Sequence, residues 1–489
     1  MSLHAQTSPE AQAALAAQRR NSTIASIIVG LLMMTLMALL FWLIGIKIFS
    51  KTTEPIVAYS SDEMAEEVVE KVKVTNAVKK TPASPSSSAS PVIAATSPSA
   101  FAVPVPEIFV DSPTPEFGES DGFGDGFGDG NGNGFGGGGG AFTALPASMK
   151  KRCSPAERLA RLKETGGNEK CEEAVVKSLD WIKGTQKADG SWTNSQPVAM
   201  TGFSILCYLG HCETPLSPDY GESVEKAIIY LVNVSKAKGG LLQTNAQAHW
   251  AYEHAIATYA LAEAYTFCKI INYEIEGLQE AVTLAGNALI NGQGTRDSWD
   301  YGLQASSGRI DNSVGAWCLQ ALKACKATGI KFPRLQTVAM EGIDRLKLST
   351  HSSGGVGYSG PGAGGHGYTL TGAGLLCMQQ WGEGKSPEAR RAGKWMDENT
   401  PFEWAGASSN LYSHYYNGQA FMEMGGQSWE DYNERFRDEV LGGQAADGSY
   451  TKPGGKMHGG GDYAVHYRTC LATLMLEVYY RFLPGTSKK

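Results

Sequence analysis

The sequence predicts an all-helical protein in which six similar helical repeats close into a ring, preceded by a single transmembrane helix and a disordered linker. Three observations lead to this prediction: an apolar run near the N-terminus, a long stretch poor in large apolar residues, and a later alternation of apolar segments with glycine-rich turns. The predicted parts are a short tail (1–22), the transmembrane helix (23–46), the linker (47–150) and the ring (151–484).

The transmembrane helix is predicted from the uncharged apolar run at 23–46, which is long enough to cross a hydrocarbon core of about 30 Å. A cleaved signal peptide is the alternative, but the run is longer than the usual apolar region and lacks an Ala-Xaa-Ala exit. Arg19 and Arg20 precede the run, while Lys47 and Lys51 follow it. The paired arginines favour a cytoplasmic tail, a single-pass membrane protein and a ring on the exported, periplasmic or extracytoplasmic side.

The linker is predicted from composition. Residues 81–115 are rich in Ala, Ser and Pro, and residues 118–140 are rich in Gly and Asp, so neither stretch can bury enough apolar surface to offset its ordering entropy. Asp121, Asp125 and Asp129 have neither the spacing of an EF-hand loop nor that of the nonapeptide calcium repeat. A flexible tether that binds no metal is therefore expected.

The ring is predicted from turns that recur at roughly 50-residue intervals, each with an apolar segment after it. The turns lie at 189–192, 239–242, 297–301, 354–358, 402–404 and 447–450. The segments after them mix small and large apolar residues at helical spacing and are expected to form an inner layer: 201–209, 252–265, 313–324, 368–381, 411–424 and 463–480. The more charged segments before the turns, such as 171–183 and 388–398, are expected to lie outside. An open solenoid is the alternative, but its last repeat would be more polar than this one is.

Two of the turns carry a family resemblance. Gln186, Gly190 and Trp192 have the same spacing as Gln444, Gly448 and Tyr450, and the pattern resembles the Gln-Trp repeat of squalene cyclases and protein prenyltransferase β subunits. The resemblance implies an α/α toroid of the terpenoid cyclase and prenyltransferase superfamily, here a membrane-anchored, bacterial-type member. The Gln amide can bond backbone groups at helix ends while the ring seals the turn, so the motif indicates architecture rather than chemistry.

Candidate site residues follow from this architecture, because the inner helices would begin around one mouth of the ring. The polar and aromatic residues near those beginnings are Trp250, Tyr252, Glu253, His254, Asp311, Asn312, His366, Tyr368, Tyr412, His414, Tyr415, Tyr416, Asp462, Tyr463, His466, Tyr467 and Arg468. Of these, Asp311, Glu253 and Asp462 are the candidate catalytic groups. Trp250, Tyr252, His254, Tyr368, His414, Tyr415 and His466 are the candidate ligand-binding groups.

The chemistry of the family is tested residue by residue. Squalene-type cyclases protonate an alkene through an Asp-Xaa-Asp-Asp-Thr segment, and the nearest match is 309–313, where only Asp311 keeps a carboxylate. The structural alternative is that Asp311 caps the helix that follows it. Prenyltransferases hold zinc through Asp, Cys and His, and the nearest match to these ligands is the pair His466 and Cys470. This pair is better explained as a hydrogen-bonded His and a packed Cys. No metal and no cofactor are expected.

Glycan-cleaving enzymes also use α/α barrels, with paired carboxylates across a cleft. Glu253, Asp311 and Asp462 would supply such a pair from different inner helices, although sequence does not give their separations.

Of the nine cysteines, Cys207, Cys268, Cys318, Cys377 and Cys470 are assigned to the inner helices and are expected in the core. Cys153 and Cys171 precede the first repeat and form the one pair for which a disulfide is plausible, provided that the ring is exported.

Two functions remain open, and the sequence does not decide whether the protein is an enzyme. The favoured one is a binding or scaffold module that lacks the family's catalytic sets and takes a protein or an apolar ligand at the mouth. The alternative is an enzyme acting on an isoprenoid or other apolar substrate with Asp311 as the acid. A glycan-processing barrel is the third and least favoured hypothesis. The partners expected are therefore the bilayer, through 23–46, and the occupant of the mouth. Nucleic acid is not expected, because the net charge is -7 and no basic stripe occurs.

Overall fold

The computed structural model describes residues 152–244, 249–362, 367–455 and 461–481. Within these ranges the chain is helical and has no strand, only the isolated bridges Thr350–Val356 and Gln444–Tyr450. The predicted tail, transmembrane helix and linker lie outside the described residues. Among the residues that are described, no helix has the length and apolar character needed to cross a membrane.

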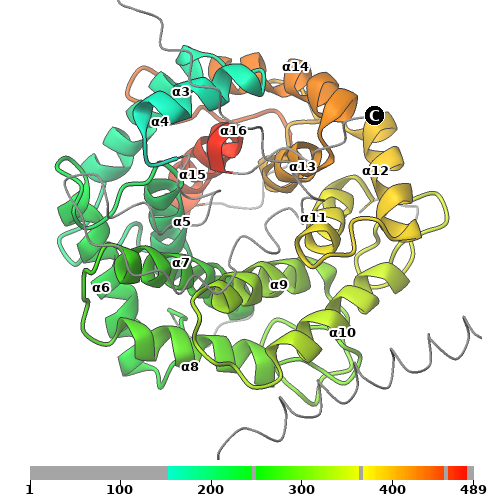
Figure 1. Ribbon diagram of the computed structural model, residues 1–489, viewed down its shortest axis with the longest axis horizontal. Helices are drawn as coiled ribbons and strands as arrows, with labels where there is room; N and C mark the ends of the chain where they lie inside the picture. The colour runs from blue at the N-terminus through cyan, green and yellow to red at the C-terminus, as the bar shows by residue number, and fades with distance from the viewer. Residues whose placement is uncertain (1–151, 245–248, 363–366, 456–460, 482–489) are drawn as a thin grey trace, which may run out of the picture. The chain divides into compact units, whose positions relative to one another are not determined.

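Six inner helices form the centre of the ring (Figure 1). They are α5 (Pro197–Gly210), α7 (Trp250–Ile270), α9 (Asn312–Ala327), α11 (Gly367–Gln380), α13 (Leu411–Met424) and α15 (Ala464–Leu476). Each contacts the next in order, and α15 contacts α5, so the described part of the ring is closed. Every residue of α5 is buried, which explains why the inner segments carry apolar residues on all sides.

The outer layer consists of the more charged helices, which cover the inner ones (Figure 1). They are α4 (Glu169–Gly184), α6 (Gly221–Ala237), α8 (Leu278–Asn291), α10 (Leu335–Leu348), α12 (Pro387–Asn399) and α14 (Gly426–Gly442), with the additional α3 (Pro155–Glu164). The short η2 (Gly461–Tyr463) leads into α15, and the buried α16 (Val478–Arg481) follows it. The outer helix α4 of the first repeat packs on α15 of the last. The predicted six-repeat, all-helical ring is thus what the described residues form.

The glycine of the turn motif allows the first and the last repeat each to approach its neighbour closely. A Cβ on Gly190 would lie 2.3 Å from the carbonyl oxygen of Lys226 in α6, and one on Gly448 would lie 2.2 Å from that of Lys177 in α4. Both glycines also have positive φ, 88° and 90°, which a side chain would strain. Since α4 belongs to the first repeat, Gly448 is one of the contacts that close the ring.

The glutamine of the motif makes the second connection between repeats. Gln186 Nε2 donates to the Ser223 carbonyl (2.9 Å) in α6, and Gln444 Nε2 donates to the Ala174 carbonyl (2.7 Å) in α4. The expectation that this amide bonds helix backbone is confirmed. The structure also shows a third copy of the glutamine motif, which the sequence analysis did not recognise. In it, Gln293 Nε2 donates to the Val338 carbonyl (2.8 Å) in α10.

The third copy escaped detection because its glycine position is occupied by Asp297, which nevertheless adopts a positive φ of 57°. Asp is among the few residues that tolerate this conformation. Trp299 completes the copy: its indole donates to the Leu289 carbonyl at 2.8 Å, as Trp192 donates to the Ile182 carbonyl at 2.8 Å. The turn geometry is therefore preserved where the sequence pattern is not.

The cysteines fall partly as expected. The five that were assigned to the core are buried and free. The pairing of Cys153 with Cys171 is wrong: Cys153 is bonded to Cys212, and Cys171 is buried and free. The reason is topological, because Cys212 follows the end of α5 and lies beside the start of α3, whereas Cys171 is buried near the start of α4.

An ion-pair network is buried among α7, α16 and the segment before α3. Glu263 of α7 accepts from Arg152 (2.7 Å) and from Arg481 (2.8 Å), and all three side chains are less than 5% exposed. The two arginines lower the pKa of Glu263 against the effect of burial. The network therefore ties both ends of the described ring, Arg152 and Arg481, to a single inner helix.

Candidate functional site

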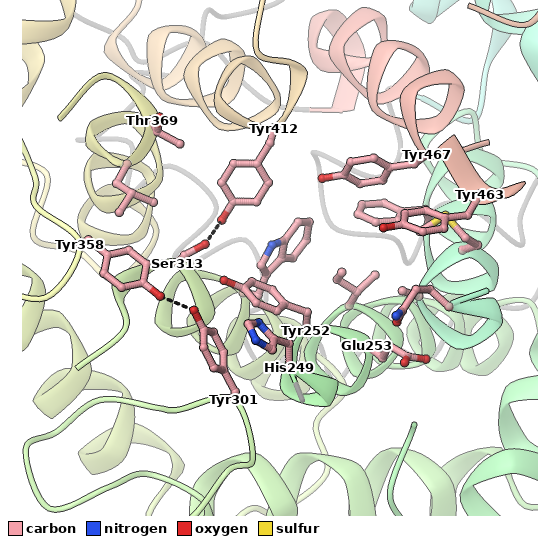
Figure 2. Close-up of a pocket in the computed structure, with 17 residues that line it drawn as sticks. His249, Tyr252, Glu253, Tyr301, Ser313, Tyr358, Thr369, Tyr412, Tyr463 and Tyr467 are labelled. Atoms are coloured by element: carbon pink, nitrogen blue, oxygen red, sulfur yellow. Dashed lines mark hydrogen bonds between the residues drawn. The ribbon is translucent and has the colours of Figure 1, made fainter. Parts of the chain in front are cut away.

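A cavity of about 530 Å³ opens where the inner helices begin. Its wall is largely aromatic, with side chains from α5, α7, α9, α11, α13 and α15 and from the turns before them (Figure 2). The lining residues are Gln196, Ala199, Met200, Phe203, His249, Tyr252, Glu253, Ile256, Tyr301, Ser313, Trp317, Tyr358, Thr369, Leu370, Tyr412, Tyr463 and Tyr467. The cavity lies at the mouth formed by the N-terminal ends of the inner helices, where the sequence analysis placed the candidate site, and its role as a site stays a prediction.

Aromatic rings contact one another along the wall. Phe203 meets Trp317 edge to face, with ring centroids 5.5 Å apart, and meets Tyr467 at the same separation. On the other side His249 stacks on Tyr301 at 3.7 Å. Contacts of this kind fix the rings in place, so the cavity has a defined shape before any ligand binds.

Glu253 is the one predicted catalytic carboxyl that lines the cavity. Its Oε2 accepts hydrogen bonds from the hydroxyl (2.6 Å) and the backbone N–H (3.3 Å) of Thr244. Burial raises its pKa, and the bonds from Thr244 only partly oppose this effect. A carboxyl with a raised pKa in an aromatic cavity can serve as an acid or as a recognition group.

Asp311 lies behind the wall rather than in it. It is fully buried and caps α9: Oδ1 accepts from the backbone N–H groups of Ser313 and Val314, both at 3.1 Å. Oδ2 accepts from the hydroxyl of Tyr358 and lies 3.5 Å from Arg309. The capping role that the sequence offered as the alternative for Asp311 is therefore present, and its part in catalysis stays a prediction.

Asp462 is exposed and holds a loop. It accepts from the backbone N–H groups of Asn194 (2.6 Å) and Ser195 (3.3 Å), which lower its pKa. It does not line the cavity. Because Asp311 does not line it either, the described residues present a single carboxyl to the cavity instead of the pair that glycoside hydrolysis requires.

Two of the candidate histidines hold backbone groups inside the protein. His254 Nδ1 accepts from the Leu242 N–H (3.0 Å) and Nε2 donates to the Ala285 carbonyl (3.1 Å), and burial lowers its pKa to about 4. His414 Nε2 donates to the Ser408 carbonyl (2.8 Å), and burial lowers its pKa to about 3. Neither residue lines the cavity.

His466 is also internal. Its Nε2 is 2.8 Å from the Ser204 hydroxyl and 3.4 Å from the sulfur of Cys470. Its ring lies 5.8 Å from that of Trp181 and 5.6 Å from that of Trp192. Nowhere in the described ranges do three His, Cys, Asp or Glu side chains gather in a way that could hold a metal ion.

The remaining candidates divide between cavity and core. Tyr252 lines the cavity, whereas Tyr415 is buried beneath it and stacks on Trp317 at 5.3 Å. Trp250 packs its ring against His254 and is not part of the lining. The side chains of His366 and Tyr368 lie outside the described residues.

The sequence analysis did not predict several of the cavity-lining residues as site residues. Tyr301 and Tyr358 were interpreted as turn aromatics, and Phe203 and Trp317 as core residues of inner helices. The turn aromatics could have been found, because a turn that feeds the start of an inner helix must itself border the mouth. Phe203 and Trp317 carry no such signal, since a core ring and a cavity ring look the same in sequence.

Comparison with known proteins gives a likeness in helical arrangement. No family model matches the sequence, and no curated protein matches it. An α-1,6-mannanase variant of Salegentibacter sp. HEL1_6, solved with α-1,6-mannotriose, is 12% identical with a TM-score of 0.46 over 64% of this chain and 99% of that one. The type II terpene cyclase MstE of Scytonema, solved with geranylgeranyl dihydroxybenzoate, is 10% identical with a TM-score of 0.39 over 64% of this chain and 97% of that one.

The contacts among its inner and outer helices make the described part of the chain an α/α toroid, with an aromatic cavity at one mouth. Because a fold does not by itself determine a function, the function has to be argued from the cavity.

Proposed function

We propose that the toroid is a ligand-binding module whose occupant lies in the aromatic cavity at its mouth. The observation that carries this proposal is that two of the three candidate catalytic carboxyls are engaged with backbone N–H groups: Asp311 caps α9 and Asp462 holds the loop at Asn194. What is left for a ligand is a shaped wall of rings with hydroxyl groups and one carboxyl. The segment 23–46 is proposed to hold this module at a membrane, with the ring on the exported side.

The test is a fragment screen by ligand-observed NMR on the full-length chain in mild detergent, using neutral, cationic and anionic fragments. Thr369 lines the cavity, so Thr369→Trp would fill it, while Thr337→Trp places the same ring on the exposed face of α10. Fragments should bind the wild type and Thr337→Trp, and should lose binding to Thr369→Trp. Binding that is equal in all three proteins would place the ligand elsewhere and defeat the proposal.

A second candidate function is an enzyme acting on an isoprenoid or other apolar substrate. The observation that favours it is the raised pKa of Glu253 in aromatic surroundings, which suits proton donation to an alkene, with ring faces stabilising the resulting carbocation. Conversion of squalene or a polyprenyl alcohol to cyclised products, lost in Glu253→Gln, would replace the binding proposal with this one. A product that formed equally in Asp311→Asn would further exclude Asp311 as the acid.

A further inference from the structure

The charge of the cavity wall is unbalanced. Among the described lining residues Glu253 is the only carboxyl, and there is no Lys or Arg. Among the described residues, the effects that act on its pKa are burial, which raises it, and the hydrogen bonds from Thr244, which lower it. Its Oε2 is engaged by Thr244, while no hydrogen bond to Oε1 is found within the described residues. Burial costs a carboxylate part of its solvation, and no described residue of the wall supplies a cation to offset that cost.

The rings of the wall favour the same sign of charge in a ligand. Tyr252, Tyr412, Tyr463 and Tyr467 line the cavity together with Phe203. The faces of such rings attract cations, by about 0.5 to 2 kcal/mol for a ring at an exposed or desolvated site. The aromatic wall and the carboxyl are independent features, and both point to a positively charged group.

At the edge of the cavity, the chain already places one of its own cations against both a tyrosine ring and a carboxylate. The guanidinium of Arg309 lies 4.2 Å from the ring centroid of Tyr301, 3.1 Å from the Tyr358 hydroxyl and 3.5 Å from the carboxylate of Asp311. There a cation contacts both a tyrosine face and an acid. At Glu253 the acid and the rings are present, and no described lining residue supplies the cation.

Figure 2 shows how the labelled side chains are distributed. Tyr252 and Glu253 extend from α7, Tyr412 and Tyr467 come from the helices opposite, and Tyr301 and Tyr358 close the far side. The cavity of about 530 Å³ has room for an alkyl chain with its terminal charge.

We propose that the cavity binds its ligand through an alkylammonium group, with Glu253 as the anionic partner and the surrounding tyrosines as the cation-binding wall. This inference rests on the proposed function, because it assigns a chemical class to the occupant of the same cavity. The alkylammonium group can come from a free amine or from a lysine side chain, which share this chemistry.

The experiment is isothermal titration calorimetry of the full-length chain in mild detergent at pH 7.5, comparing n-butylammonium with the neutral n-butanol. The wild type is expected to bind n-butylammonium at least tenfold more tightly than n-butanol. Glu253→Gln should weaken n-butylammonium at least tenfold and change n-butanol less than twofold. Glu423→Gln is the matched control, because this partly buried carboxyl of α13 lies outside the lining and should leave both affinities unchanged.

Two results would overturn the inference. Equal affinity of the wild type for the two probes would exclude recognition of the charge, while binding that remained sensitive to Thr369→Trp would leave the proposed function standing. No binding of n-butylammonium at all would also overturn the inference, and the fragment screen then decides the proposed function separately. The comparison of two probes on the wild type stands even if Glu253→Gln fails to fold.

The source of the group is distinguished with peptides. Acetyl-Gly-Lys-Gly-amide is compared with the same peptide acetylated on the lysine side chain. Tighter binding of the free lysine peptide than of n-butylammonium assigns the cavity to a lysine of a partner protein. Weaker binding of that peptide than of n-butylammonium assigns it to a small free amine. Equal binding of the acetylated and unmodified peptides would contradict recognition of an ammonium group.

Discussion

The hydroxyl of Tyr358 donates a hydrogen bond to the buried carboxylate of Asp311, and so joins the fourth turn to the beginning of α9. A backbone hydrogen bond makes the same connection, because the Asn312 N–H donates to the Tyr358 carbonyl at 2.9 Å. Asp311 thus links two repeats directly behind the wall of the cavity. Its position makes it a structural determinant of that wall, whatever the ligand.

The losses of unfolding free energy caused by substitution of Asp311 and of Tyr358 should not add up in the double variant. Asp311→Ala removes a helix cap and an acceptor for Tyr358, and we expect it to lower the free energy of unfolding by roughly 2 to 3 kcal/mol. Tyr358→Phe should lower it by about 1 kcal/mol. In urea denaturation followed by circular dichroism, the double variant should be less destabilised than the sum. Strict additivity would show that the two side chains do not interact in solution.

The buried ion network should be sensitive to loss of Glu263, which pairs with both arginines. Glu263→Gln removes the buried carboxylate that pairs with both Arg152 and Arg481, and we expect a loss of about 3 to 5 kcal/mol in stability. Differential scanning calorimetry measures the effect. Glu222→Gln removes an exposed pair with Lys226 and should leave the melting temperature unchanged. Equal melting temperatures for the two variants would contradict the network's role.

Acid should destabilise the ring in part through His254. Its pKa is lowered from 6.5 to about 4 by burial, so between these values the unfolded chain takes up a proton that the folded chain refuses. Stability therefore falls as the pH drops through this window, by roughly 3 kcal/mol in all. The difference in unfolding free energy between the wild type and His254→Gln should narrow from pH 7 to pH 4. A difference that stayed constant would show that this imidazole does not titrate in that way.

Reduction should destabilise the ring through one disulfide. Cys153 and Cys212 are 59 residues apart, and a cross-link of that span contributes about 2 to 4 kcal/mol. Dithiothreitol should lower the thermal midpoint of the wild type and of Cys171→Ala, but not that of the double variant Cys153→Ala/Cys212→Ala. If dithiothreitol did not change the thermal midpoint of Cys171→Ala, the result would support the pairing of Cys153 with Cys171 instead.

The membrane anchor can be tested without the structure. The full-length chain should remain with the membrane fraction after extraction with alkaline carbonate, and deletion of residues 23–46 should release it, because the apolar run alone is long enough to span the bilayer. Immunoblotting of the two fractions measures this. Release of the full-length chain by carbonate would refute the anchor.

The sequence by itself determined the helical repeats, the inner and outer layers and the burial of the five core cysteines, because these depend on local periodicity and on how apolar each segment is. It could not identify the third copy of the turn motif, since Asp297 adopts a conformation that glycine usually signals. Nor could it choose the partner of Cys153, which depends on where the end of α5 comes to lie.

Only the tertiary structure decided which polar side chains face the cavity. Glu253 and His254 are adjacent on α7, yet Glu253 lines the cavity while His254 points into the outer layer and bonds Leu242 and Ala285. Neighbouring helix positions point about 100° apart, so the direction that each one faces follows from how the whole helix is rotated in the ring. That rotation is set by packing against other repeats, far away in the sequence.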